Sequence, residues 1–185
     1  MRTIIPQENN PVLREHALPV SIAQIKSEPI QTLIADMKKL LAKEKHGVAI
    51  AAAQVGEPIQ LFIVSGRALT ERDTDDDPKD TERETPILPD QIYINPVLVK
   101  MSRAKKEKHE GCLSIRGKWG MVPRAEKATV SAYDEHGNKF TRGASGFLAH
   151  VFQHEMDHLA GILYTDKAAK LYDDKPEDDE NDDDE

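Results

Sequence analysis

The sequence is short of cysteine, with a single one at position 112 among 185 residues. One cysteine excludes a disulfide within the chain and is typical of proteins kept in a reducing compartment. The sequence also lacks any apolar stretch near the ~20 residues that a membrane-spanning helix needs. Its first residues do not combine a charged segment with an apolar run, as a secretory signal does. We therefore expect a cytoplasmic protein with no membrane partner.

A strong positive charge is absent as well. The formal net charge is −8, but residues 173–185 alone hold ten Asp/Glu and one Lys. Because the whole chain totals −8, the other 172 residues total +1. A nearly neutral body offers no electrostatic argument for DNA binding, and we expect none.

The composition predicts one folded domain followed by an acidic tail. With 38% apolar residues, the chain can bury one sizeable core. We expect a single domain at residues 1–168 and an acidic, disordered tail at 169–185. Residues 66–90 hold nine Asp/Glu, four Lys/Arg and three Pro, which predicts a charged loop inserted in the domain.

Hydrophobic periodicity predicts the main elements. Apolar residues at helical spacing indicate a helix over residues 28–46. A second helix is expected to begin after Ser145, as its cap, and to end at Gly161. Segments rich in Ile, Val, Tyr and Leu predict strands. The clearest strands are expected at 60–65, 91–99 and 128–133.

The chemically most informative stretch covers residues 153–159 and contains H-E-x-x-H. On a helix, residues i and i+4 lie one above the other, so the imidazoles of His154 and His158 can bind the same metal ion. Glu155 follows the first histidine and can take a proton from a water at that ion. Apolar residues flank the motif at helical spacing, which predicts a largely buried helix.

A catalytic tetrahedral site needs a third protein ligand. The longer pattern of one group of zinc proteases would place it six residues after the second histidine, where this sequence has Tyr164. Cys112 is the better candidate, because a thiolate is a strong ligand and a bound metal keeps it deprotonated. A lone cysteine is otherwise a small buried apolar residue, and two helical histidines can be ordinary core residues, so those interpretations stay open here.

Three stretches together resemble the peptide deformylase family. Residues 47–54, 110–114 and 153–159 correspond, in order, to the family motifs G-x-G-x-A-A-x-Q, E-G-C-L-S and Q-H-E-x-D-H-L. The likeness covers about residues 3–165. It implies an α+β fold in a single domain, with small antiparallel sheets packed around a central metal-binding helix. It also implies a metal-dependent hydrolase that removes the N-formyl group from the N-terminal formylmethionine of newly made proteins and releases formate.

The resemblance also implies how the metal site works. Cys112, His154 and His158 would bind one divalent metal ion, natively Fe²⁺, with Zn²⁺, Ni²⁺ or Co²⁺ able to take its place. Glu155 would act as general base and then as general acid. The implied partners are N-formylmethionyl nascent peptides and the ribosome near its exit tunnel, and the implied oligomeric state is a monomer.

Two further residues acquire a role through the resemblance, and one departs from it. The Gln54 amide and the Leu113 backbone N–H would donate to the oxyanion of the reaction. Without the resemblance, Gln54 is more simply an ordinary glutamine at the edge of the core. Ala49 stands where the family has its second glycine. If that position needs a positive φ, alanine is strained there; if it only needs close approach, the methyl group narrows the cleft.

The methionine pocket implied by the resemblance is apolar. Val48, Phe147 and Val151 are its candidate lining residues, and His150 is a less usual one. The remaining candidates for substrate contact are Ala49, Glu110 and Gly111.

Two other functions have to be weighed against deformylation. A metalloendopeptidase with an unusual cysteine ligand would cleave proteins such as casein internally, but the sequence does not supply the third ligand usual for such enzymes. A catalytically silent binding protein would bind metal at most, with Ala49 as a sign of decay. The intact set of candidate catalytic and ligand residues weighs against that second alternative.

Overall fold

The computed structural model describes residues 2–70 and 88–173. Most of the expected charged loop and of the expected tail lies outside these residues. Two ends of those segments are described and differ from the expectation. Residues 66–70 form the short helix α2 (Gly66–Thr70), and residues 170–173 form the strand β8 (Lys170–Asp173). The folded part therefore extends beyond the expected boundary at residue 168.

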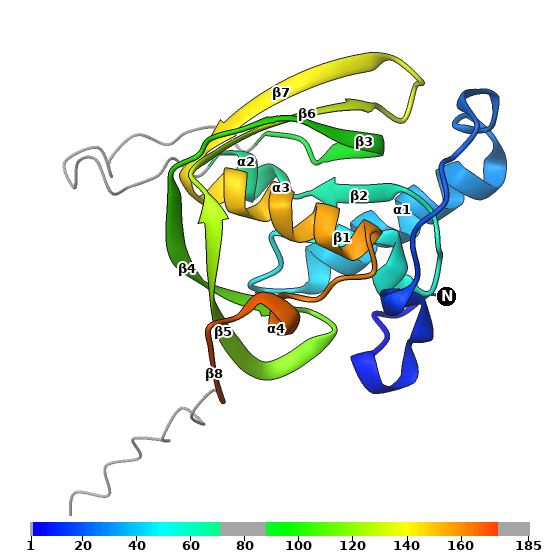
Figure 1. Cartoon of the computed structure of the whole chain (residues 1–185). Helices are drawn as coiled ribbons and strands as arrows, with labels where there is room; N and C mark the ends of the chain where they lie inside the picture. The colour runs from blue at the N-terminus through cyan, green and yellow to red at the C-terminus, as the bar shows by residue number, and fades with distance from the viewer. Residues whose placement is uncertain (1, 71–87, 174–185) are drawn as a thin grey trace, which may run out of the picture.

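The described strands form two antiparallel sheets around one helix, which confirms the predicted α+β fold (Figure 1). The larger sheet has the order β1-β2-β3-β6-β7, and the smaller has the order β4-β5-β8. Helix α3 (Gly146–Leu159) contacts β1, β6 and β7 of the larger sheet and β5 of the smaller one. The metal-binding motif predicted on this helix therefore lies between the two sheets.

The strands follow the predicted pattern more closely in the larger sheet than in the smaller one. The predicted strands at 60–65, 91–99 and 128–133 correspond to β2, β3 and β6. Strands β4 and β8 were not predicted, because β4 is rich in charge and β8 is short. The bounds are β1 Ala49–Ala51, β2 Leu61–Val64, β3 Gln91–Met101, β4 Lys105–Cys112, β5 Ile115–Ala125, β6 Lys127–Tyr133 and β7 Lys139–Ser145.

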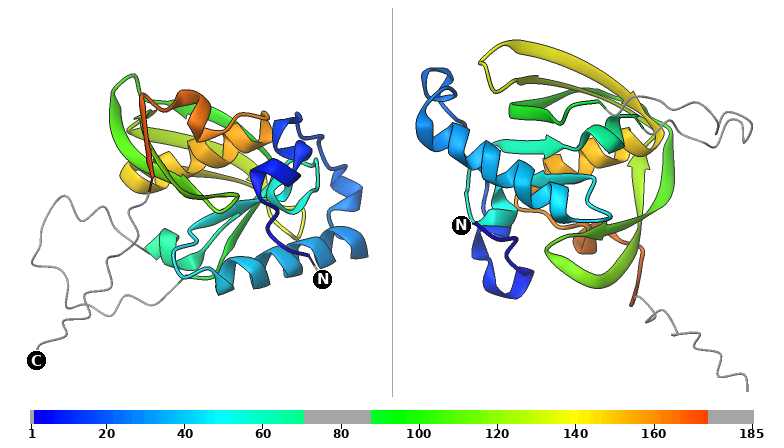
Figure 2. Two further views of the ribbon diagram at one scale, coloured as in Figure 1. Left: turned by 90° about the horizontal axis from the view of Figure 1, so that it is seen from below. Right: turned by 180° about the vertical axis from the view of Figure 1, so that it is seen from behind.

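The long helix α1 (Glu28–Lys43) covers the outside of β1 and β2 (Figure 2). It ends three residues before the predicted limit at residue 46. Its buried side chains pack with those of β2 and β3 into one apolar cluster. None of the described helices is long and apolar enough to cross a membrane. The buried residues of α1 are Leu33, Ile34, Met37 and Leu41.

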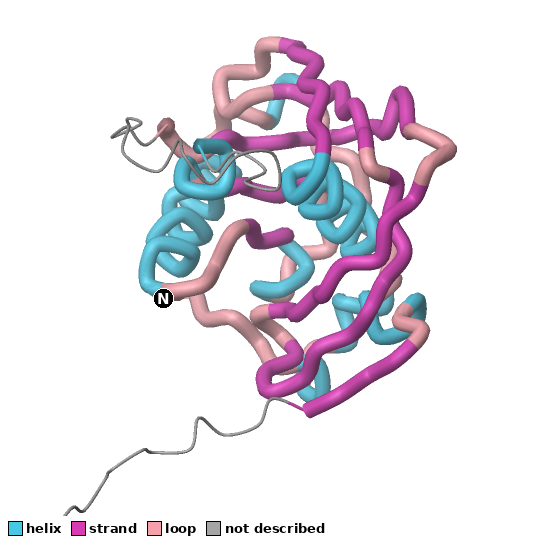
Figure 3. The backbone as a smooth tube through the Cα atoms, turned by 90° about the vertical axis from the view of Figure 1, so that its left-hand side faces the viewer, coloured by secondary structure: helices cyan, strands magenta, loops and turns pink. Residues whose placement is uncertain are grey.

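Short helical turns complete the chain around this frame. The N-terminal arm folds against η4, where the Asn10 side-chain amide donates to the Ala53 carbonyl at 2.8 Å. Figure 3 shows strands running above and beside the central helix. The remaining elements are η1 Gln7–Asn9, η2 Pro11–Arg14, η3 Ile22–Gln24, η4 Ala52–Val55 and α4 Tyr164–Lys167.

An aromatic cluster holds α3 against the larger sheet. The rings of Phe62 and Tyr93 are stacked, with centroids 4.5 Å apart. Phe152 of α3 meets the Tyr93 ring edge-on at 5.3 Å. All three side chains are essentially inaccessible to solvent. Such contacts fix the rotation of the helix about its axis, and with it the direction in which the histidines point.

The two ends of α3 differ in how well the sequence predicted them. Ser145 occupies the cap position but makes no side-chain hydrogen bond there, so its predicted capping bond is absent. Gly161 lies two residues after the last helical residue with φ of 72°, as expected of a terminating glycine. A Cβ at this position would lie 2.8 Å from the Arg14 carbonyl oxygen.

We expect Gly161→Ala to be destabilising by about 2–3 kcal/mol, because the left-handed φ and the backbone clash add together. Gly137 is a matched control, since its φ is 80° but a Cβ there would meet nothing within 4 Å. Gly137→Ala should cost about 1 kcal/mol. Urea unfolding of both variants measures the difference. Equal midpoints would contradict the packing of Gly161 against the N-terminal arm.

Candidate metal centre

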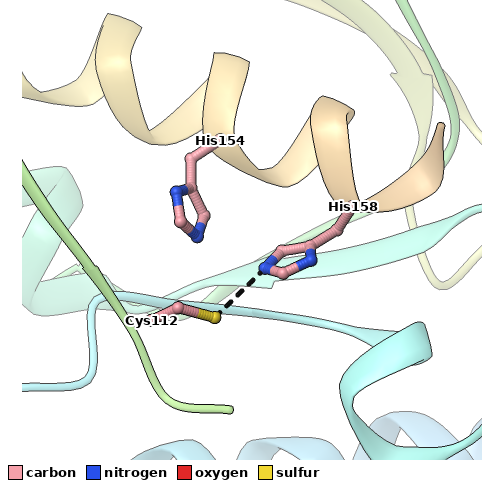
Figure 4. Close-up of side chains that lie close together, drawn as sticks. All are labelled: Cys112, His154 and His158. Atoms are coloured by element: carbon pink, nitrogen blue, oxygen red, sulfur yellow. Dashed lines mark hydrogen bonds between the residues drawn. The ribbon is translucent and has the colours of Figure 1, made fainter. Parts of the chain in front are cut away.

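Three side chains from two elements converge beneath α3. Cys112 ends β4, whereas His154 and His158 lie one turn apart on α3. Their candidate ligand atoms all lie within 4.8 Å of one another. Both imidazoles project from the helix toward the sulfur (Figure 4). Cys112 Sγ is 3.4 Å from His158 Nε2, and the two imidazole centroids are 4.9 Å apart.

The two imidazoles differ in their surroundings, because burial lowers the pKa of His154 but Cys112, Glu110 and Glu155 raise it further, so that it lies above the ordinary value. His154 Nδ1 is 2.9 Å from a carboxylate oxygen of Glu110, which leaves Nε2 to face the cluster. His158 is 1% exposed, and burial holds its pKa well below the ordinary value. A neutral imidazole is the form that ligates a metal. The donor set of one thiol and two imidazoles therefore fits a divalent transition metal.

A buried ionic network fixes Glu110 behind the first histidine. Arg124 of β5 donates to both of its carboxylate oxygens, at 2.6 and 2.9 Å. Burial opposes the charge of Glu110, but hydrogen bonds from Arg124 and His154 lower its pKa to about 2. Arg124 also donates to Asp157 at 2.5 Å, and Lys167 donates to the same carboxylate at 2.6 Å.

Glu110 was expected to touch substrate, and the structure gives it other partners. Because its oxygens bind Arg124 and His154, it orients the imidazole. Glu110 also lines the cavity, and its contact with substrate stays a prediction. Sequence reasoning missed Arg124 and Asp157 as parts of the site. No local pattern marks Arg124 as a site residue, and nothing local relates it to Asp157, 33 residues away.

Glu155 lies beside the metal cluster with one carboxylate oxygen that has no hydrogen-bond partner in the described part of the chain. The residue is 3% exposed, and this burial raises its pKa to about 7. A carboxyl group with that pKa can both accept and release a proton near neutral pH.

Gln54 reaches the cluster from η4. Its side-chain oxygen accepts a hydrogen bond from the Ala51 backbone N–H at 2.8 Å, which fixes the orientation of the amide. The amide nitrogen then lies 3.4 Å from Cys112 Sγ. Gln54 is 2% exposed, so its amide is buried next to the Cys112 thiol, and its role as an oxyanion donor stays a prediction.

These side chains open into one cavity of about 350 Å³. All the candidate site residues line it except His158. Trp119 of β5 forms a further part of the cavity wall. The candidates on the wall are Val48, Ala49, Gln54, Glu110, Gly111, Cys112, Leu113, Phe147, His150, Val151, His154 and Glu155.

Ala49 is not strained. It belongs to β1, and the only non-glycine residue with a positive φ among those described is Asn95. The methyl group therefore costs no backbone energy, and it lies on the cavity wall with the residue 6% exposed. Of the two consequences considered for alanine here, only the narrowing of the cleft remains.

This site is that of a metal-dependent hydrolase. Two histidines of an H-E-x-x-H helix meet a cysteine from a strand, next to a buried carboxylate and a cavity. Comparisons with known proteins agree. The family model described as polypeptide deformylase matches residues 2–174. Peptide deformylase 2 of Nostoc sp. is 37% identical over 163 residues, covering 88% of this chain and 84% of that protein. The peptide deformylase of Chloroflexus aurantiacus is 36% identical, covering 89% and 84%.

Solved structures show the same fold. A class I type b peptide deformylase from Acinetobacter baumannii, solved with Met-Ala-Ser bound, has a TM-score of 0.74 and 28% identity. The match covers 90% of this chain and 98% of that one. A peptide deformylase from Synechococcus elongatus, solved in complex with actinonin, has a TM-score of 0.72 and 31% identity, and the match covers 91% and 79%.

The chain belongs to the polypeptide deformylase family. It is a metal-dependent hydrolase of protein biosynthesis, which removes the N-formyl group from N-terminal formylmethionine and releases formate. This membership replaces the two alternatives weighed on the sequence, an endopeptidase and a silent binding protein.

Proposed function

We propose that Cys112, His154 and His158 hold one divalent metal ion and that formylmethionyl peptides are hydrolysed beside it. The observation that carries this proposal is the convergence of their three ligand atoms within 4.8 Å, on the wall of a cavity that also contains Glu155. A divalent metal ion bound there supplies a water of lowered pKa and polarises the formyl carbonyl.

Glu155 is the proton carrier in this proposal. Its carboxylate takes the proton that the attacking water loses and passes it to the nitrogen of the leaving amine. Two observations support the assignment. The carboxylate lines the cavity next to His154, and its pKa of about 7 suits both halves of the transfer.

Two hydrogen-bond donors beside Cys112 are assigned to stabilise the negative charge that develops on the formyl oxygen. One is the Gln54 amide nitrogen, held in place because the side-chain oxygen is bound to the Ala51 N–H. The other is the backbone N–H of Leu113, the residue that follows the proposed thiolate ligand. Losing one such donor typically costs about a hundredfold in rate.

The methionine side chain is assigned to the apolar part of the cavity. Val48, Phe147 and Val151 line it, and the Ala49 methyl group narrows it. His150 lies on the same wall with 4% exposure. The Acinetobacter relative with Met-Ala-Ser bound supports a methionyl peptide as the ligand of this fold. Because Gly111 has no side chain, the Trp119 ring packs closely against its backbone, where a Cβ would lie 3.3 Å from the ring.

The native metal in this proposal is Fe²⁺, as the family resemblance implies. Zn²⁺, Ni²⁺ and Co²⁺ are possible substitutes, because one thiolate and two imidazoles can bind all four ions. The substrates are N-formylmethionyl nascent peptides, met in the cytoplasm by a monomer near the ribosomal exit tunnel. The single cysteine, which suits a reducing compartment, supports the cytoplasmic assignment.

The test is formate release from formyl-Met-Ala-Ser by protein purified without oxygen, with metal content measured in the same sample. We expect about one metal ion per chain, loss of formate release after chelation, and recovery when Fe²⁺ is added back. Unchanged formate release by metal-free protein would contradict the proposal.

A further inference from the structure

We propose that the rim of the cavity selects formylated peptides that carry acidic residues after the methionine, and that Lys118 is the main determinant. This inference rests on deformylation taking place in the cavity described above. It adds a preference for part of the substrate that the metal cluster and the methionine pocket do not contact.

Acidic and basic side chains lie at different depths in the cavity wall. The two carboxylates on the wall, Glu110 and Glu155, are 8% and 3% exposed and lie next to the metal cluster. The cations on the wall lie farther out. Arg116 and Lys118 are exposed on β5, and Lys108 of β4 is half-buried. A substrate therefore meets positive charge at the mouth of the cavity before it reaches the buried acids.

Two acidic residues neighbour the cations of β5. Arg116 donates to Glu44 at 2.8 Å, which neutralises part of its charge. Asp173 lies opposite Lys118 in the pairing of β5 with β8, but no ion pair joins the two side chains. The Lys118 backbone is fixed, because its carbonyl accepts a hydrogen bond from the Tyr164 hydroxyl at 2.9 Å. The Lys118 backbone is therefore held in place at the cavity wall.

The path of the peptide leads past this rim. With the methionine side chain in the apolar part of the cavity, the rest of the peptide has to leave through the open side. Trp119 borders that side and packs over Gly111, where a Cβ would lie 3.3 Å from the indole. Each extended residue advances the chain by about 3.3 Å, so the next few residues pass Trp119 and its neighbour Lys118.

Charge at such an exposed rim acts on the capture of substrate, and its effect is screened by salt. Exposed charge pairs change affinity by up to about fivefold each. A peptide with two acidic residues after the methionine should therefore be preferred over one with two basic residues by about tenfold in kcat/KM at low ionic strength. The preference should approach unity in about 1 M salt, where the screening length is roughly 3 Å.

The test compares formyl-Met-Ala-Glu-Glu with formyl-Met-Ala-Lys-Lys, using the full metal-loaded chain. Lys118→Glu should reduce the ratio of the two kcat/KM values at least fivefold, mainly through KM. Lys105→Glu is the matched control, since it makes the same charge change on exposed β4 away from the cavity wall. Its ratio should equal that of the unmodified chain.

Two results would overturn the inference. One is an equal kcat/KM for the acidic and basic peptides in the unmodified chain. The other is a ratio that Lys118→Glu and Lys105→Glu change to the same extent, since this would make the preference a property of the overall charge. Formyl-Met-Ala-Ser distinguishes both results from a failure of the deformylase assignment. Its turnover depends on the three proposed metal ligands and not on the charges of the rim. Absence of formate from this neutral peptide would contradict both proposals.

Discussion

Replacing Glu155 with alanine should reduce formate release by a factor of about 10²–10⁴ and leave the metal ion bound. The reason is that Glu155 lies on the cavity wall but is not one of the three converging ligand residues. Without its carboxylate, the attacking water loses the group that is proposed to take its proton. The measurements are kcat with formyl-Met-Ala-Ser and metal content per chain in the same preparation.

The isosteric variant Glu155→Gln is the companion control. It keeps the volume of the side chain in a site where the residue is 3% exposed, so a comparable loss of turnover would assign the effect to the proton and not to a cavity. Full activity of either variant would show that another group carries the proton. Loss of metal from both variants would instead make Glu155 part of the metal site.

Replacing Cys112 with alanine should remove the metal ion as well as the activity. The two imidazoles alone leave an incomplete coordination sphere, and a catalytic site of this kind needs three protein ligands. A ligand present at 1,000 times its Kd stabilises the folded state by about 4 kcal/mol. For a chain of this length that corresponds to a rise in Tm on the order of 10 °C when metal is added. Cys112→Ala should lose this rise.

His109→Ala provides the matched control for the ligand experiment. His109 also lines the cavity, but its ring packs edge-on against Tyr172 at 5.5 Å, and it is not in the converging cluster. This variant should keep stoichiometric metal and the metal-dependent rise in Tm. If Cys112→Ala also kept both, the thiol would not be a ligand.

The candidate site could be predicted from the sequence where the signal is local or chemically rare. His154 and His158 share a helix face because of their spacing alone. Cys112 could be predicted as the third ligand, because it is the one thiol in the chain and a catalytic site needs three protein ligands. The structure brings these three residues together, although no local pattern indicates that the end of β4 lies next to α3.

Contacts between distant strands could not be predicted in the same way. Strand β8 pairs with β5 across about fifty residues, with Leu171 opposite Gly120, and its four residues carry no periodic signal. The Arg124 guanidinium links Glu110 of β4 to Asp157 of α3, three elements that only the fold brings together. The predicted capping bond of Ser145 is wrong for a different reason. Serine is a common residue at the N-cap and Ser145 occupies that position, but its side chain makes no capping hydrogen bond.

The most direct test of the metal site is X-ray absorption at the metal edge of the zinc-loaded protein. With Cys112, His154 and His158 as ligands, the first shell should contain one sulfur at about 2.3 Å and two nitrogens at about 2.0–2.1 Å. The sulfur should vanish in Cys112→Ser. A first shell of nitrogen and oxygen alone in the unmodified protein would contradict the account.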